Sequence, residues 1–163
     1  MRNEDEPKNS LIRQEKGELI GKQSLVSRSV IRNLIREAID SMKNAYTPYS
    51  NFTVGAALLT ANQKIYTGCN IESASFSPTI CAERTAFSKA ISEGERRFAA
   101  IAIVGGKNGM LVDYTPPCGV CRQVMREFVD PGKFLVILAK SEEEYNVFFL
   151  EELLPMSFGP ENL

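Results

Sequence analysis

The chain has 163 residues, 44% of them apolar, and a formal net charge of -1. This length suits a single globular domain with its own core. The near-neutral charge argues against a nucleic-acid surface, because polynucleotides are held through many Lys/Arg contacts to phosphate. No apolar run reaches the roughly 20 residues that span a bilayer, and no leader-like apolar segment opens the chain. We therefore expect a cytoplasmic protein with a small-molecule substrate and no nucleic-acid or membrane partner.

Residues 1–28 differ in composition from the rest of the chain, since they are polar and charged with only short apolar clusters. Such a composition is typical of a mobile or loosely docked extension. A helix that packs against a partner subunit is the alternative. We expect the folded domain to occupy residues 29–163.

The remaining sequence predicts a helix, two strands, and then helices and strands in alternation. Apolar residues recur at helical spacing from Val30 to Met42, with Ser29 as the expected cap. The later elements are expected as strands at 52–60 and 64–70, a helix at 81–92, a strand at 98–104 ended by Gly105-Gly106, a helix at 118–128, strands at 134–139 and 145–149, and a helical turn at 151–154. This order predicts the α/β class, with a sheet flanked by helices.

Two short motifs carry the chemistry of this chain. Cys81-Ala82-Glu83-Arg84 opens the second predicted helix and Pro117-Cys118-Gly119-Val120-Cys121 opens the third, while the chain has no histidine. Three thiolates can fill three corners of a zinc tetrahedron, and a catalytic zinc keeps the fourth corner for water. Residues three apart on a helix share a face, so Cys118 and Cys121 can bind one metal together. Helix N-termini also lower the pKa of nearby thiols.

Glu83 and Arg84 are expected to complete this site. Glu83 follows the first thiol by two residues and can handle the proton of a metal-bound water without occupying the metal. Three cysteines with a glutamate are the established pattern of zinc-dependent deaminases. Three thiolates on Zn²⁺ leave a net negative charge, which Arg84 can balance by donating hydrogen bonds to sulfur.

Other interpretations of the cysteines stay open at this point. A closed structural zinc site needs a fourth protein ligand, for which Cys69 is the candidate, although no second cysteine stands beside it at ligand spacing. Cys118 and Cys121 also have the CxxC spacing of redox sites, but the usual βαβ context and a flanking aromatic residue are missing. If the zinc site is structural, the chain would be a non-catalytic interaction module held together by zinc, which is the alternative to an enzyme.

The two motifs and three further segments, in the same order, closely resemble the small three-cysteine cytidine deaminases. The further segments are YSNFTVGAA at 49–57, GCNIE at 68–72 and LLPMSFGP at 153–160. The resemblance implies a three-layer α/β/α fold with a mixed sheet of about five strands, one Zn²⁺ per subunit, and a homotetramer with shared active sites. The implied reaction is the hydrolytic deamination of cytidine and deoxycytidine to uridine and deoxyuridine, with release of ammonia, in pyrimidine salvage.

The resemblance also implies roles for individual residues. Cys81, Cys118 and Cys121 would bind the zinc, Glu83 would be the catalytic acid/base, and Arg84 would tune the metal without binding it. The implied substrate contacts are Asn70 and Glu72 with the ribose 3′-hydroxyl, Phe52 with the base or sugar, the Ala82 N–H with the pyrimidine O2, and Ala74, Phe76 and Phe158 at a site shared with a neighbouring subunit. Without the resemblance, each phenylalanine would be interpreted as core packing.

The chain departs from the family pattern at three positions. Ser73 stands where relatives usually have Asn, Phe76 where Tyr is common, and Pro116 where many have Ser. These changes can alter the preference for the sugar, but they leave the metal ligands and Glu83 in place. A deaminase of a modified nucleoside, or of a base within nucleic acid, is the alternative function. The near-neutral charge and the predicted ribose segment favour a free nucleoside.

Overall fold

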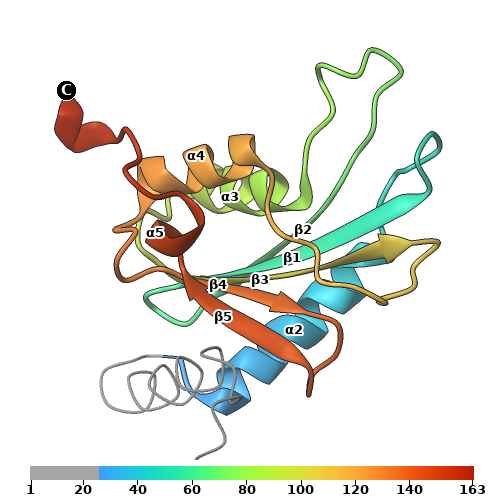
Figure 1. Ribbon diagram of the computed structural model, residues 1–163, viewed down its shortest axis with the longest axis horizontal. Helices are drawn as coiled ribbons and strands as arrows, with labels where there is room; N and C mark the ends of the chain where they lie inside the picture. Colours follow the sequence, from blue (N-terminus) through green and yellow to red (C-terminus); the bar gives the residue numbers. More distant parts are fainter. Residues whose placement is uncertain (1–25) are drawn as a thin grey trace, which may run out of the picture.

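The computed structural model describes residues 26–163, which form a five-stranded sheet with helices on both faces (Figure 1). The elements are α2 (Arg28–Met42), β1 (Phe52–Thr60), β2 (Ile65–Cys69), α3 (Ala82–Ser92), β3 (Phe98–Lys107), α4 (Gly119–Phe128), β4 (Leu135–Ala139), β5 (Tyr145–Phe149), α5 (Leu150–Leu153) and a 3-10 turn η1 (Pro160–Asn162). The predicted extension lies outside the described residues as far as residue 25. Within residues 26–163, every helix is too short or too polar to cross a membrane.

The sheet is mixed, with the strand order β2-β1-β3-β4-β5. β3 and β4 are parallel, and the other neighbouring strands are antiparallel. A parallel pair needs a crossover connection, which α4 supplies between β3 and β4. The predicted α/β class and the mixed sheet of five strands are thereby confirmed.

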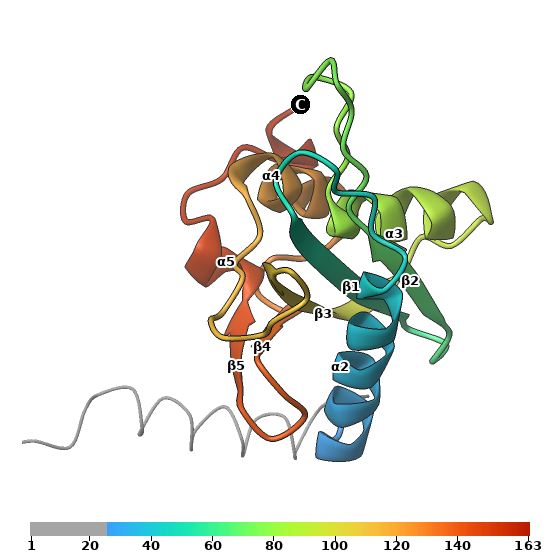
Figure 2. The same cartoon turned by 90° about the vertical axis from the view of Figure 1, so that its right-hand side faces the viewer.

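The two faces of the sheet belong to two separate apolar cores, because successive side chains of a strand point in opposite directions. On β1, Ala56 and Leu58 pack in the cluster that contains α3 and α4 residues, whereas Ala57 and Leu59 pack with α2. Figures 1 and 2 show α2 on one face of the sheet and α3 with α4 on the other. The molecule therefore has the expected three-layer α/β/α arrangement.

The helix α2 begins earlier than the sequence pattern predicted, and the prediction of Ser29 as its cap is wrong. Ser27 is the N-cap, and its Oγ accepts a hydrogen bond from the Val30 N–H at 3.3 Å. Val26, just before this cap, is 2% exposed and lies in the same apolar cluster as Ile31. This is the arrangement of a hydrophobic staple, which selects Ser27 over Ser29 by anchoring the chain ahead of the cap.

The strand β3 continues through the two glycines that were predicted to end it. Gly105 and Gly106 both pair with β1, and the strand runs on to Lys107. A Cβ at Gly106 would collide with the main chain of Met110, because the loop after β3 folds back onto the strand. These glycines therefore allow close packing within a strand and do not form a turn.

The first turn of α3 lies directly on β2, and this contact positions the site described below. A Cβ at Gly68 would collide with the carbonyl oxygen of Ala82 and the N–H of Ala86. Only glycine lets the strand and the helix backbone approach this closely. The beginning of α3, with the cysteine that precedes it, is thus held against the sheet.

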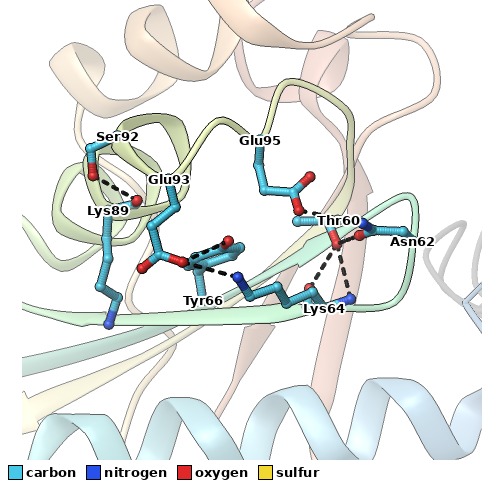
Figure 3. A network of polar contacts seen from close by, with 8 residues as sticks. All are labelled: Thr60, Asn62, Lys64, Tyr66, Lys89, Ser92, Glu93 and Glu95. Carbon is cyan, nitrogen blue, oxygen red and sulfur yellow. Dashed lines mark hydrogen bonds and ion pairs between the residues drawn. The ribbon is translucent and has the colours of Figure 1, made fainter.

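The opposite end of α3 is tied to the β1–β2 hairpin by polar contacts (Figure 3). The Glu93 carboxylate accepts a hydrogen bond from the Tyr66 hydroxyl at 3.1 Å and pairs with the Lys64 ammonium group at 2.9 Å. The Asn62 amide donates to Glu95 at 3.3 Å. Exposed ion pairs contribute little stability individually. Together with Gly68, however, these contacts fasten both ends of the helix that begins at the motif Cys81-Ala82-Glu83-Arg84.

Candidate active site

The three cysteines predicted to bind a metal converge where two helices begin. Cys81 is the N-cap of α3, Cys118 is the N-cap of α4, and Cys121 lies in the first turn of α4. Their Sγ atoms all lie within 4.8 Å of one another, with Cys81 to Cys118 at 3.9 Å and Cys118 to Cys121 at 3.5 Å. Neither N-cap cysteine uses its side chain to cap its helix, so both sulfurs are available as metal ligands.

The separations between these sulfurs fit a zinc ion. Zinc–sulfur bonds of about 2.3 Å at tetrahedral angles place two sulfurs about 3.8 Å apart. Within residues 26–163 the cluster consists of these three cysteines, and Cys69 does not belong to it. The closed four-cysteine structural site is therefore not supported. Three protein ligands instead leave one tetrahedral position for water, as in catalytic zinc sites.

The thiol cluster is prepared to carry negative charge. A hydrogen bond with Cys121 lowers the pKa of the Cys81 thiol to about 5. The Arg84 guanidinium also lowers this pKa, whereas burial acts in the opposite direction. The N-terminus of α3 favours the thiolate in the same way. The hydrogen bond with Cys81, together with burial, raises the pKa of the Cys121 thiol. The Cys121 thiol therefore keeps its proton in the absence of metal. A bound cation favours loss of this proton, which couples metal binding to proton release.

Glu83 is buried next to the cysteine cluster, in the first turn of α3, with 4% of its surface exposed. Burial, reinforced by the charge of the Cys81 thiolate, raises the pKa of the Glu83 carboxyl. A carboxyl group with a raised pKa can hold and release a proton closer to neutral pH, as a general acid/base must. The environment of Glu83 thus suits proton transfer.

Arg84 is the cation next to the thiols. Its Nη2 donates a hydrogen bond to the Thr79 carbonyl oxygen at 2.7 Å. Its Nε is buried and has no hydrogen-bond partner among residues 26–163. Burial opposes the charge of the guanidinium, but hydrogen bonding and attraction to the Cys81 thiolate keep its pKa above the ordinary value. A buried N–H donor without a partner is what the sulfurs of a three-thiolate zinc site can use, so the donor set fits the metal.

Replacing Arg84 with glutamine is expected to lower zinc affinity or kcat by about 10- to 100-fold, which is typical for partners of metal ligands. The physical reason is the loss of the positive charge that offsets three thiolates. Competition with a chromogenic chelator measures the affinity, and steady-state kinetics measures kcat. Arg96→Gln, an exposed arginine after the far end of α3, is the matched control. Unchanged zinc affinity together with unchanged kcat in Arg84→Gln would contradict the assigned role.

Three residues predicted to contact the substrate lie where β1 begins and β2 ends, which are neighbouring ends of an antiparallel pair. Phe52 is the first residue of β1, and Asn70 and Glu72 follow β2. The Asn70 amide is bonded to β1 at both atoms, with Oδ1 accepting from the Val54 N–H at 2.8 Å and Nδ2 donating to the Phe52 carbonyl oxygen at 2.8 Å. The structure therefore brings these residues together, while their contacts with a substrate stay predictions.

The other predicted substrate residues lie on exposed segments or at the start of α3. Ala74 and Phe76 belong to the loop between β2 and α3, where Phe76 is 75% exposed and meets the Tyr49 ring edge-on at 6.3 Å between centroids. Phe158, in the C-terminal segment, is 59% exposed. Ala82 is buried as the first residue of α3, so its N–H has no partner within the helix.

Sequence analysis missed Ser50. Its hydroxyl contacts the Glu72 carboxylate and the main chain of Phe52, and it thereby joins two residues of the predicted site. Serine followed by asparagine ahead of a strand is a turn signal. That signal could have drawn attention to this residue, although not to its contact with Glu72.

Sequence analysis also missed the contacts that hold the C-terminal segment on α4. The buried Arg126 donates from Nε to the Ser157 hydroxyl at 3.0 Å and forms an ion pair with Glu161. Gln123, one turn earlier, donates to the Phe158 carbonyl oxygen at 3.0 Å. The helix that supplies two of the three thiols therefore also fixes the main chain at Phe158. No local sequence pattern marks Arg126.

Comparison with known proteins agrees with this geometry. Residues 28–137 match the family model described as the cytidine and deoxycytidylate deaminase zinc-binding region. The cytidine deaminase of Sporosarcina psychrophila is 44% identical over 133 residues, covering 82% of this chain and 94% of that protein. That of Halalkalibacterium halodurans is 45% identical over 130 residues, covering 80% and 95%.

Solved structures show the same similarity. The crystal structure of cytidine deaminase from Burkholderia pseudomallei has a TM-score of 0.71 at 44% identity, covering 77% of this chain and 97% of that one. The crystal structure of the Mycobacterium tuberculosis cytidine deaminase has a TM-score of 0.66 at 36% identity, covering 78% and 95%. Sequence, fold and the three-cysteine cluster with its glutamate thus agree, and the chain belongs to the cytidine and deoxycytidylate deaminase family.

Proposed function

We propose that this protein catalyses the hydrolytic deamination of cytidine and deoxycytidine to uridine and deoxyuridine, with release of ammonia. The observation that carries the proposal is the meeting of three thiols with a buried glutamate whose pKa is raised. Zinc-dependent deaminases use this combination to replace an amino group of a nucleobase with an oxygen from water. A free nucleoside is the substrate that the net charge of -1 favours.

The proposed mechanism assigns proton transfer to Glu83. Cys81, Cys118 and Cys121 hold the zinc, which when bound lowers the pKa of a water toward neutrality. Glu83 accepts a proton from this water and delivers it to N3 of the pyrimidine, so that C4 becomes electrophilic. The hydroxide oxygen that remains adds to C4, Glu83 carries its proton to the amino group, and the C4–N4 bond breaks so that ammonia leaves and the oxygen stays on C4.

The remaining residues bind and orient the nucleoside in this proposal. Asn70 and Glu72 bind the 3′-hydroxyl of the sugar, and Phe52 packs against the base or the sugar. The N–H of Ala82 donates to O2 of the pyrimidine. The location of these residues around the ends of β1 and β2 and the start of α3 supports the assignment. Orientation of the base against Glu83 is what converts binding energy into rate.

We further propose a cytoplasmic homotetramer that acts in pyrimidine salvage, binds one zinc ion per subunit and shares its active sites between subunits. In this arrangement Ala74, Phe76 and Phe158 reach the site of a neighbour. The large exposed side chains of Phe76 and Phe158 support it, since apolar surface of this kind marks sites of association. Light scattering of the purified protein tests the assembly, and a fully active monomer would contradict it.

Zinc analysis combined with a turnover assay tests the proposed function. We expect one zinc ion per chain and a loss of absorbance near the cytosine band with cytidine and deoxycytidine, but not with cytosine-containing oligonucleotides. Zinc without turnover of any nucleoside would favour the non-catalytic module. Activity on the oligonucleotide, or only on a modified cytidine, would favour the alternative deaminases.

A further inference from the structure

We propose that Ser50 is a positioning residue, which orients the Glu72 carboxylate and the main chain at Phe52 for the sugar of the bound nucleoside. This inference rests on the proposed function, because it takes the sugar to lie against Glu72. Ser50 belongs to neither the metal site nor the acid/base machinery. Its role follows from how it is bonded.

The Ser50 hydroxyl is bonded on both sides. Its O–H donates to Oε1 of Glu72, and its Oγ accepts from the Phe52 N–H at 2.9 Å. The second contact is the ST-turn pattern, in which a hydroxyl bonds the N–H two residues later. Asn51, between them, has a φ of 55°, a left-handed conformation that asparagine tolerates better than most residues. The turn and the carboxylate are thus fixed by one side chain.

The Glu72 carboxylate is held so that a single acceptor position is left. Its Oε2 accepts from the N–H of Tyr49 at 2.9 Å and from the N–H of Ser50 at 3.3 Å. Its Oε1 accepts from the Ser50 hydroxyl. A carboxylate offers about four acceptor positions, so the contacts with residues 26–163 leave one, on Oε1. The main chain of Glu72 is fixed as well, since its N–H donates to the Tyr46 carbonyl oxygen at 2.8 Å.

The hydrogen-bonding groups of Glu72 and Asn70 that have no partner among residues 26–163 are complementary to a hydroxyl group. The Asn70 Nδ2 donates one hydrogen to the Phe52 carbonyl oxygen, and an amide nitrogen has a second hydrogen to give. A sugar hydroxyl can donate to Glu72 and accept from Asn70. The hydrogen bond from the Ser50 hydroxyl, followed by that from the Tyr49 N–H, lowers the pKa of the Glu72 carboxyl. Glu72 therefore remains an acceptor at neutral pH.

Comparison of cytidine with 3′-deoxycytidine separates a positioning role from a merely structural one. We expect Ser50→Ala to raise the KM for cytidine about tenfold, since hydrogen bonds to charged groups are among the stronger ones, with kcat within about twofold of wild type. With 3′-deoxycytidine, which lacks the hydroxyl, the same variant should have the KM of the wild-type protein. Ser50→Thr keeps the hydroxyl and should restore the wild-type KM for cytidine.

Two further variants complete the experiment. Ser92→Ala, which removes a hydroxyl bonded to the Lys89 carbonyl oxygen at the far end of α3, is the matched control and should change neither KM. Ser50→Cys keeps the size of the side chain but donates weakly, and it replaces Ser50→Ala if that variant does not fold. Thermal unfolding of each variant verifies that it is folded.

The possible outcomes test three statements separately: the role of Ser50, the placement of the sugar and the proposed function. An equal rise in KM for both nucleosides in Ser50→Ala, or no rise for either, would overturn the positioning role while the proposed function stands. Equal KM values of the wild-type protein for the two nucleosides would overturn the placement of the sugar at Glu72, and this inference with it. Absence of any cytidine turnover in the zinc-loaded wild-type protein would overturn the proposed function itself.

Discussion

Replacing Glu83 with glutamine is expected to leave zinc binding intact and to lower kcat by about 10²- to 10⁴-fold, the usual contribution of a general acid/base. Glutamine has nearly the same shape as glutamate but cannot carry a proton from water to the base. Metal analysis and single-turnover kinetics on the same preparation measure both effects. Turnover near the wild-type rate in a zinc-loaded Glu83→Gln variant would refute the proposed mechanism.

The control for this variant comes from the residue that follows the same helix. Glu93 lies just beyond the end of α3, exposed and paired with Lys64, so Glu93→Gln should retain full activity. Stability provides a second control. Since burial raises the pKa of the Glu83 carboxyl, its ionised form is costly in the folded protein. Glu83→Gln removes that cost, and its melting temperature should not fall below that of the wild-type protein.

Replacing Cys121 with alanine is expected to abolish both zinc binding and turnover. Cys121 is the most buried of the three thiols, so its loss removes a ligand that water cannot easily replace and opens a cavity in the core around α4. Because a metal that binds only the folded state adds to its stability, the melting temperature should fall as well. Metal analysis, kinetics and thermal unfolding measure the three effects.

Cys69→Ala is the matched variant, because Cys69 is a cysteine outside the cluster. It should keep its zinc and its activity. Equal loss of zinc in the Cys69 and Cys121 variants would mean that a fourth thiol closes the metal site. A fourth thiolate would then occupy the coordination position expected for water, which would exclude catalysis by a zinc-activated water.

The metal site could be predicted from sequence because its residues are grouped in two short motifs. Cys118 and Cys121 share a face of one helix by spacing alone, and Glu83 follows Cys81 within one turn. That these two helix starts meet is a property of the sheet, in which α3 and α4 cover the same face. The expectation that all three cysteines bind one zinc ion implied this meeting, and the structure brings their Sγ atoms within 4.8 Å of one another.

The contacts that were missed are those between segments far apart in the chain. Ser50 reaches Glu72 across the β1–β2 pair, and Arg126 reaches Glu161 from α4. A single polar side chain leaves no periodic pattern, so its partner cannot be inferred from composition or spacing. The wrong end of β3 has a different cause, since the two glycines were interpreted as a turn, whereas Gly106 lies within the strand and allows the main chain of Met110 in the next loop to pack against it.

The two helices that carry the metal ligands both begin at a cysteine that makes no side-chain capping hydrogen bond. A serine, threonine or aspartate at such a position stabilises a helix by about 0.5–2 kcal/mol, so both helix starts forgo this stabilisation. We expect a metal held by the three thiols to compensate for it. Without metal, we expect these first turns to open to proteases more readily than in the metal-bound protein. Zinc shortage in a cell should therefore shorten the lifetime of the polypeptide itself, in addition to silencing the enzyme.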